Sequence, residues 1–234
     1  MADSVETISG WERALLAAEK VKERLKRSTA ALEQAGVPYA VAGGNAVAEW
    51  VGRVDEDAVR NTRDVDILIR RTDLAAVKAA LEPAGFVYCQ SFGLEMFLDG
   101  PGGRHTSAVH LVFAGEPVRI NDPTIAPDVT DSESSAEFRV LSLEGLVRMK
   151  LTAFRLKDQV HLLDLIGVGL IDQNWTPRMP PDLATRLQQL LDNPNGRFND
   201  PRVGGHYSAR NVTFPSTTVS TDRIFLISSG GQEK

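Results

Sequence analysis

Two aspartates lie two positions apart in a short apolar segment. Asp64 and Asp66 alternate there with Val65, Ile67 and Ile69. Because side chains in a β-strand alternate between two faces, we expect both carboxylates to lie on the same face. Carboxylate oxygens are ligands that Mg²⁺ prefers in proteins, so Asp64 and Asp66 are candidate metal ligands. Taken alone, such a pair is more often a solvated strand edge than a metal site.

A pair of glycines precedes the aspartates. Gly43 and Gly44 follow the apolar run 39–42, and Asn45 begins a segment, 45–50, that has the composition of a short helix. Glycine has no side chain, so backbone N–H groups can approach a ligand closely at such a turn. A helix N-terminus also attracts anions, because its first N–H groups lack intrahelical partners. The segment therefore predicts a phosphate site, although a Gly-Gly pair by itself is usually only a turn.

The order of these features is rarer than either feature alone. A strand, a Gly-Gly turn, a short helix and an Asp-x-Asp strand together resemble the signature of the polymerase-β-like nucleotidyltransferase superfamily, over about residues 30–170. The resemblance implies an α+β fold with a mixed sheet flanked by helices. It also implies transfer of a nucleoside monophosphate from a nucleoside triphosphate to a hydroxyl acceptor, with Mg²⁺ as cofactor. The implied metal ligands are Asp64 and Asp66, and the implied nucleotide-binding residues are Gly43, Gly44 and Asn45.

The two halves of this signature are unusually far apart. Gly44 and Asp64 are separated by 20 positions (64 − 44), which is longer than the family's usual spacing. A surface loop absorbs such an insertion at little cost, because the entropy of loop closure grows only logarithmically with length. Arg63 lies beside the first carboxylate. It is a candidate nucleotide-binding residue, with a solvated surface charge as the alternative.

Two helical segments, 143–154 and 157–166, carry further charged residues. By default these charges form a solvated face. Small family members of the abortive-infection and antibiotic-resistance type have a lysine on one helix and an Arg-x-Lys-Asp-like start to the next. Lys150 and the segment 155–158 resemble that arrangement. The resemblance implies that Lys150 faces the triphosphate and that Asp158 is an orienting or acceptor-side acid.

A histidine stands where the family places a third carboxylate. Active members carry this acid on a later core strand, where it completes the second metal site and helps to deprotonate the acceptor. The corresponding strand here, 108–113, has His110 at that position. Neutral imidazole is a poor Mg²⁺ ligand but a competent general base near neutral pH. His110 is therefore a candidate base; alternatively it is a core histidine, and the site is inactive or takes its third acid from Glu95.

Composition restricts the function further. The net charge of −5 argues against a broad nucleic-acid surface, which is normally basic. The sequence has no apolar run of about 18 residues, the length of a membrane span, and its N-terminus is acidic, so we expect a cytoplasmic protein without a membrane segment. Cys89 is the only cysteine, which excludes an internal disulfide, and its apolar surroundings predict a core residue.

The apolar pattern predicts one core with additions at both ends. Shorter predictions concern a loop over 121–137 and strands at 118–120 and 223–228. The predicted units are an N-terminal helix packed on the core (1–36), a nucleotidyltransferase-like core (37–140), C-terminal helices (141–192) and a flexible tail (193–234).

Three classes of function are compatible with these residues. The first is an active nucleotidyltransferase. The second is a nucleotide-binding relative without turnover, acting as a regulator or as half of a toxin–antitoxin pair with a cognate partner protein. The third is an interaction domain whose aspartates are incidental. Mg²⁺-dependent nucleotide binding separates the third class from the others, and transfer of labelled nucleotide separates the first from the second. The acceptor cannot be inferred, because acceptor pockets are built from variable loops on a shared scaffold.

Overall fold

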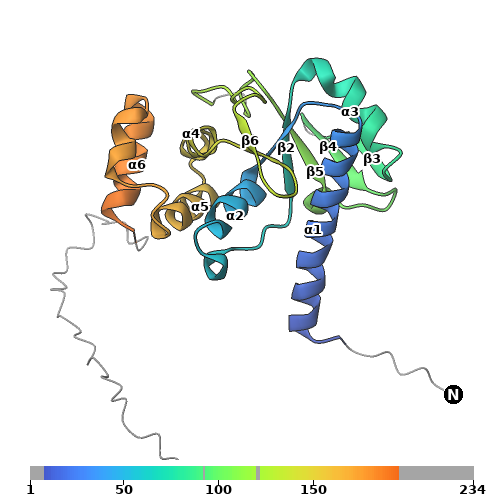
Figure 1. The fold of residues 1–234 in the computed structure, drawn as a ribbon, viewed down its shortest axis with the longest axis horizontal. Coiled ribbons are helices and arrows are strands. Elements are labelled where there is room, and N and C mark those ends of the chain that lie inside the picture. Colours follow the sequence, from blue (N-terminus) through green and yellow to red (C-terminus); the bar gives the residue numbers. More distant parts are fainter. Residues whose placement is uncertain (1–7, 92, 120–121, 195–234) are drawn as a thin grey trace, which may run out of the picture. The chain divides into compact units, whose positions relative to one another are not determined.

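The residues that the structure describes, 8–91, 93–119 and 122–194, build a seven-stranded mixed sheet (Figure 1). The structure is a computed structural model. Its strand order is β3-β4-β5-β2-β1-β7-β6, in which β5 is parallel to β2 and β7 is parallel to β1, while the other neighbours are antiparallel. The strands are β1 (Ala40–Ala42), β2 (Val65–Ile69), β3 (Phe86–Ser91), β4 (Leu94–Asp99), β5 (Val109–Phe113), β6 (Ser132–Ser134) and β7 (Arg139–Leu141).

Helices cover both faces of this sheet. The longest, α1 (Gly10–Gln34), begins with a capping box: the Ser9 hydroxyl accepts a hydrogen bond from the backbone N–H of Glu12, and the Glu12 carboxylate accepts one from the backbone N–H of Ser9. Both N–H groups would otherwise lack a partner in the helix. The other α-helices are α2 (Gly43–Gly52), α3 (Leu74–Leu81), α4 (Leu143–Ala153), α5 (Leu156–Gly167) and α6 (Pro181–Asp192).

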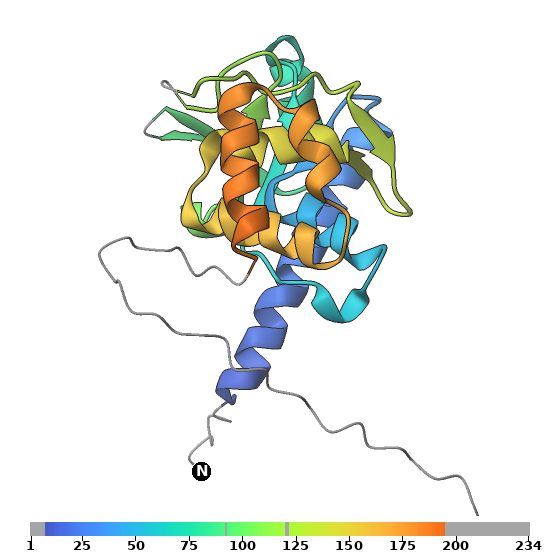
Figure 2. The ribbon, with the colours of Figure 1, turned by 90° about the vertical axis from the view of Figure 1, so that its left-hand side faces the viewer.

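The sheet separates two apolar cores. Val65, Ile67 and Ile69 of β2 belong to one core, together with side chains of α1 and α3. Leu68 of the same strand belongs to the other, together with side chains of α2, α4, α5 and α6. Figure 1 shows the two groups of helices on opposite sides of the sheet, and Figure 2 shows the second group from its own side. Because strand residues alternate, Asp66 lies on the face that carries α2, α4 and α5.

The observed architecture confirms the predicted α+β class, with a mixed sheet flanked by helices. Two local predictions are wrong. The predicted loop 121–137 contains β6, a polar strand whose backbone groups find partners on β7. Residues 118 and 119 form a bend instead of a strand. The predicted tail from residue 195 onward, with the strand at 223–228, lies outside the described residues. Among the helices of the described ranges, none combines the length and the apolar character that a membrane crossing requires.

Candidate active site

The turn from β1 into α2 can be built only with glycine. Gly43 has φ +64°, a left-handed conformation, and a Cβ atom there would lie 1.8 Å from Oδ2 of Asp66. A Cβ atom on Gly44 would lie 2.7 Å from the hydroxyl oxygen of Thr62. The residue before the helix, Ala42, provides no side-chain cap, so the first N–H groups of α2 have no partner from that residue. The turn therefore brings N–H groups suited to an anion directly beside a carboxylate.

Asp66 lies in a row of paired residues that crosses the sheet. Its cross-strand partner on β1 is Ala42, and its partner on β5 is His110. His110 pairs in turn with Met96 of β4. Directly paired residues project to the same face, and neighbouring strands are about 4.8 Å apart. The register of the sheet therefore places His110 and Asp66 side by side on one face, as the alternation in the sequence predicted.

Asp64 and Asp66 lie close enough for their negative charges to interact. Burial raises the pKa of Asp64; the nearby His110 opposes this shift, and the negative charge of Asp66 adds to it. A divalent cation would stabilise both ionised carboxylates, and their hard oxygen atoms suit Mg²⁺. Asp64 and Asp66 thus have the donor chemistry for one divalent cation. No cluster of three or more His, Cys, Asp or Glu side chains suited to a metal occurs within the described ranges.

Asn45 fixes the position of the aspartate strand. Its side-chain Nδ2 donates a hydrogen bond of 2.7 Å to the backbone carbonyl oxygen of Asp64, and the side chain is buried. This bond ties the first turn of α2 to the residue that precedes β2. One of the two N–H donors of the side-chain amide is therefore committed to holding this strand.

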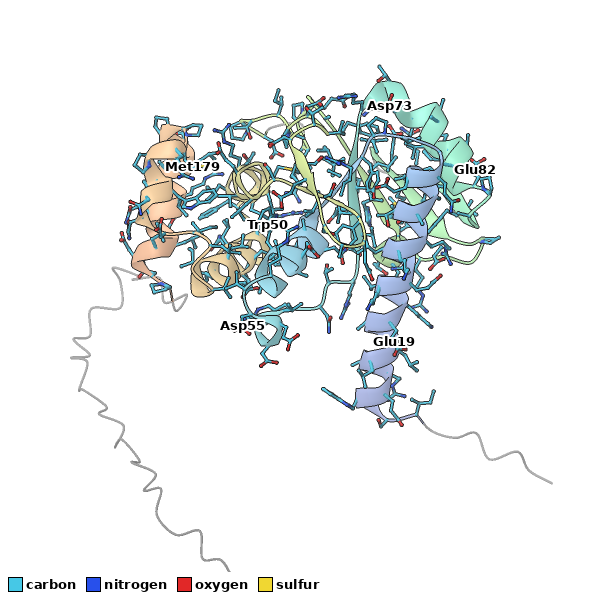
Figure 3. All side chains as sticks on the ribbon, in the orientation of Figure 1. Glu19, Trp50, Asp55, Asp73, Glu82 and Met179 are labelled. Carbon is cyan, nitrogen blue, oxygen red and sulfur yellow. The ribbon has the colours of Figure 1, made fainter. Side chains whose placement is uncertain are left out.

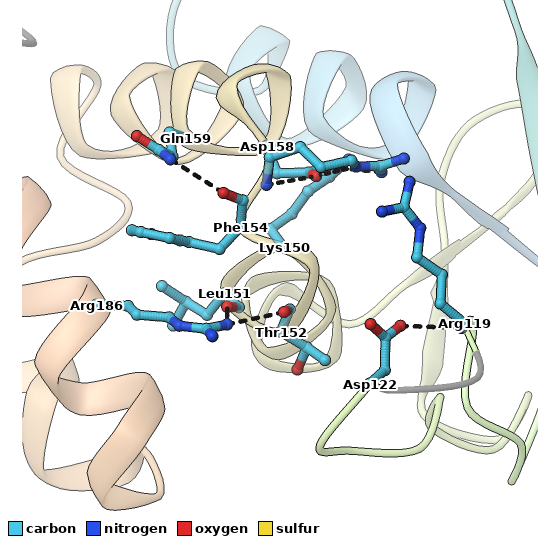
Figure 4. A network of polar contacts seen from close by, with 10 residues as sticks. Arg119, Asp122, Lys150, Leu151, Thr152, Phe154, Asp158, Gln159 and Arg186 are labelled. Atoms are coloured by element: carbon cyan, nitrogen blue, oxygen red, sulfur yellow. Dashed lines mark hydrogen bonds and ion pairs between the residues drawn. The ribbon is translucent and has the colours of Figure 1, made fainter.

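Lys150 lies on α4 and is 6% exposed. Its Nζ is 3.3 Å from Oδ1 of Asp158, which is 1% exposed. Arg155 Nε lies 2.6 Å from the other carboxylate oxygen of Asp158 (Figure 4). Burial lowers the pKa of Lys150, while the charges of Asp158 and Asp66 oppose that shift, which places Lys150 near Asp66 of β2. Burial opposes ionisation of Asp158, but the hydrogen bond from Arg155 and the charge of Lys150 keep its pKa below the usual value.

The connection between α4 and α5 brings Lys150 and Asp158 together. Phe154 ends α4 with φ 43°, a left-handed conformation that reverses the chain within three residues. Gln159 donates to the carbonyl oxygen of Phe154 over 3.0 Å. Arg186 of α6 donates through one nitrogen to the carbonyl oxygens of Leu151 and Thr152, at 2.6 and 2.8 Å (Figure 4). These bonds satisfy the last carbonyl groups of α4 and hold the strained turn.

Glu95 does not supply a third acid. It adjoins Met96, the partner of His110, and alternation places it on the opposite face of the sheet. Its carboxylate accepts hydrogen bonds from Arg71 at 2.7 Å and from the hydroxyl of Tyr88 at 3.0 Å. Glu95 is therefore occupied on the far face, and the alternative that it completes the metal site is wrong.

The sequence analysis did not identify Arg24 of α1, which supports the site from the opposite face of the sheet. Arg24 is 4% exposed, and its Nη1 donates to the backbone carbonyl oxygen of Arg63 at 3.5 Å. Its Nε donates to Asp99 at 3.2 Å, and its charge partly opposes the rise in the pKa of Asp64 that burial causes. The side chain of Arg63 itself is exposed. The sequence did contain one indication of this role. Arg24 adjoins Leu25, a core residue of the same helix, and an arginine that is buried with such a neighbour requires hydrogen-bond partners.

The structure thus gathers most of the predicted residues on one face. Arg63 lies at the rim, and Asp158 lies behind Lys150, where it orients that lysine and does not face solvent. The residues gathered around the start of α2 and the aspartate strand are Gly43, Gly44, Asn45, Asp64, Asp66, His110 and Lys150.

Comparisons with known proteins find similarity in structure only. No protein-family model and no curated protein matches the sequence. An antigenic nucleotidyltransferase-like protein from Paracoccidioides brasiliensis is 18% identical and superposes with a TM-score of 0.48, over 76% of this chain and 91% of that chain. The antibiotic-resistance factor ANT(2″)-Ia is 15% identical in two structures. Its solution structure gives a TM-score of 0.41 over 74% of this chain and 82% of that chain, and its crystal structure with adenylyl-2″-tobramycin gives 0.39 over 73% and 86%.

At these identities and TM-scores the similarity is one of fold, and the function of this chain has to be inferred from its own residues.

Proposed function

We propose that this protein is a Mg²⁺-dependent nucleotidyltransferase that moves a nucleoside monophosphate from a nucleoside triphosphate to a hydroxyl acceptor. The observation that carries the proposal is the close approach of Gly43 and Asp66, in which any side chain at position 43 would collide with the carboxylate. A phosphate bound at the start of α2 would therefore lie next to the Asp64–Asp66 pair. Phosphoryl-group chemistry needs this combination of anion site and metal ligands.

Each residue has a role that follows from its position. Asp64 and Asp66 would hold Mg²⁺, whose positive charge would stabilise the negative charge of the phosphate oxygens and of the leaving group. Backbone N–H groups of Gly43, Gly44 and Asn45 bind the phosphates. Lys150 adds a positive charge for the triphosphate, and Asp158 keeps that lysine protonated and correctly oriented.

We assign His110 to the deprotonation of the acceptor. It lies beside Asp66 in the sheet register and is half-buried. In the reaction, the acceptor oxygen bonds to the α-phosphorus, and the bond from that phosphorus to the bridging oxygen of the β-phosphate breaks. The electron pair leaves with pyrophosphate, and the hydroxyl proton passes to a ring nitrogen of His110.

The test is calorimetric titration with nucleoside triphosphates, with and without Mg²⁺, on Asp64→Asn and Asp66→Asn. Asparagine keeps the shape of the side chain but lacks the charge, so we expect both variants to fold and to lose metal-dependent binding. Asp182→Asn, an exposed position at the start of α6, is the matched control. Metal-dependent binding that persists in both site variants would exclude this site.

A second function is supported by His110 itself. A site with two carboxylates and a histidine can bind a metal–nucleotide complex without turning it over. We therefore keep a nucleotide-binding regulator or toxin–antitoxin component, with a cognate partner protein, as the alternative function. Mg²⁺-dependent binding without transfer of labelled nucleotide to any acceptor in a broad panel would favour this alternative.

A further inference from the structure

The first half of α1 exposes large apolar side chains. Trp11 is 76% exposed and Leu15 is 51% exposed. Figures 1 and 2 both show these first turns extending past the sheet, and the side chains around Glu19 in Figure 3 have no other drawn helix or strand beside them. An exposed tryptophan on a regular helix is unusual in a monomer and is typical of interaction surfaces.

Trp11 continues the face by which α1 packs on its own core. Leu25 and Leu32 are buried in the core that α1 shares with α3. Residues that precede Leu25 by alternating steps of 4 and 3 positions lie on the same face of the helix. We call these residues the α1 stripe. The α1 stripe consists of Trp11, Ala14, Ala18 and Val21. The N-terminal half of the α1 stripe packs on no other element in the described ranges, so it presents an uncovered apolar surface.

A cavity of about 240 Å³ opens at the C-terminal end of the α1 stripe, beside Ala18 and Val21. Its lining mixes apolar side chains of α1, α2 and the segments near 59 and 138 with polar and charged ones. The polar and charged lining residues are Lys22, Asn45, Glu49, Arg60, Asn61, Thr62 and Glu137. This volume is below the range of about 300–1,000 Å³ that is typical of sites for drug-sized ligands, and it suits a single large side chain. The apolar lining residues are Ala18, Val21, Leu25, Ala48, Val59 and Phe138.

We propose that the chain forms a two-fold symmetric dimer in which the α1 helices of two copies lie antiparallel, and Trp11 of each copy enters the cavity of the other. In a two-fold interface, if residue i of one copy contacts residue j of the other, then j also contacts i. Trp11 and Ala18 are 7 positions apart (18 − 11), which is two helical turns on one face. Antiparallel pairing about the point between Ala14 and Leu15 therefore places each Trp11 against Ala18 of the other copy.

The sizes of the contacting side chains and the antiparallel direction of the two helices both favour this arrangement. The largest side chain of the α1 stripe meets a small one beside a cavity, and large-to-small packing of this kind lets two helices approach closely. The second half of α1 packs on its own core. A parallel partner would need the space that this core occupies, whereas an antiparallel partner places its own core at the opposite end. Both the exposed tryptophan and the cavity that fits it belong to this chain, which is why the occupant is a second copy.

Sedimentation velocity over a wide range of protein concentration tests the proposal. We expect the full chain to dimerise reversibly and Trp11→Ala to weaken the dimer by about thirtyfold or more, the effect of losing a central aromatic anchor. Ala18→Trp is the discriminating variant. It adds apolar surface but blocks the entrance to the cavity, so specific insertion predicts loss of the dimer, whereas nonspecific apolar association predicts that the dimer is kept or strengthened.

Leu16→Ala is the matched control, because Leu16 is also exposed but lies on the opposite side of α1 from the α1 stripe. It should leave dimerisation unchanged. Circular dichroism establishes that each variant is folded. A wild-type chain that stays monomeric at all concentrations, or an Ala18→Trp variant that dimerises as well as the wild type, would overturn the proposal.

Discussion

The Nζ atom of Lys150 lies 3.3 Å from Oδ1 of Asp158, and both side chains are almost completely buried. The pair joins α4 to α5 and lies close enough to Asp66 for that aspartate to influence the pKa of Lys150. A buried ammonium group without a partner loses its proton more readily, because burial disfavours the charged form. Asp158 therefore keeps Lys150 charged at the place where the triphosphate is proposed to bind.

Asp158→Asn should destabilise the protein by about 3 kcal/mol, since breaking a buried pair leaves one charge uncompensated. It should also weaken nucleotide binding, because the remaining lysine is charged less often. Urea unfolding and calorimetry measure the two effects. The double variant Lys150→Met/Asp158→Leu separates them: apolar replacement of both partners should restore most of the stability while nucleotide affinity stays low. Nucleotide affinity that recovers with stability would contradict a direct role for Lys150.

Gly43→Ala and Gly36→Ala form a matched pair of variants. Both glycines have φ +64°, but a Cβ atom on Gly36 meets nothing within 4 Å, whereas one on Gly43 collides with Asp66. Gly36→Ala should therefore cost only the backbone strain, about 1 kcal/mol. Gly43→Ala should cost several kcal/mol more and should displace the carboxylate, so that Mg²⁺-dependent nucleotide binding is lost. Equal stabilities and unchanged binding in the two variants would show that the tight contact at Gly43 is unimportant.

Local sequence patterns predicted the parts of the site that depend on local geometry. The period-two alternation around Asp66 placed it on one face, and the same alternation in 108–113 placed His110 toward that face; the register between β2 and β5 then makes them neighbours. The glycine pair signalled a close approach of the backbone. These features depend on strand and turn geometry, which a short stretch of residues determines by itself.

Features that arise from long-range packing were not accessible in the same way. Arg24 contacts the carbonyl of Arg63, 39 positions away, only because α1 folds across the sheet. The family resemblance implied that Asp158 is an orienting or acceptor-side acid, but only the turn at Phe154 shows that it is buried against Lys150. β6 was missed because its polar residues carry no strand signal, since a strand at a sheet edge can form through backbone pairing alone.

Because His161 is half-buried, we expect the free energy of unfolding of the protein to depend on pH. Burial, and next the charge of Lys150, lower its pKa from 6.5 to about 4, and its Nδ1 has no hydrogen-bond partner among the described residues. Between these two values the unfolded chain binds a proton that the folded chain does not, so stability falls as pH drops through this window. The loss should be about 1 kcal/mol, because solvent screens a half-buried group.

Urea unfolding of wild type and His161→Asn at several pH values between neutral and mildly acidic provides the measurement. Asparagine is polar but does not titrate in this range, so the variant should lose less stability than the wild type on acidification. Parallel profiles for the two proteins would show that His161 does not contribute to the acid sensitivity.

His110→Ala and His110→Asp decide which of the two proposed functions is correct. If His110 accepts the acceptor proton, alanine should slow transfer of labelled nucleotide by about a hundredfold or more and leave nucleotide binding within a few-fold, since general bases act in the transition state. Aspartate places a third carboxylate beside Asp66, in the register that β2 and β5 already share. An alanine variant that transfers as fast as the wild type would exclude His110 from catalysis. An aspartate variant that transfers faster, with a steeper dependence on Mg²⁺, would show that the natural site is a weakened one, and the nucleotide-binding regulator would then replace the enzyme as the preferred function.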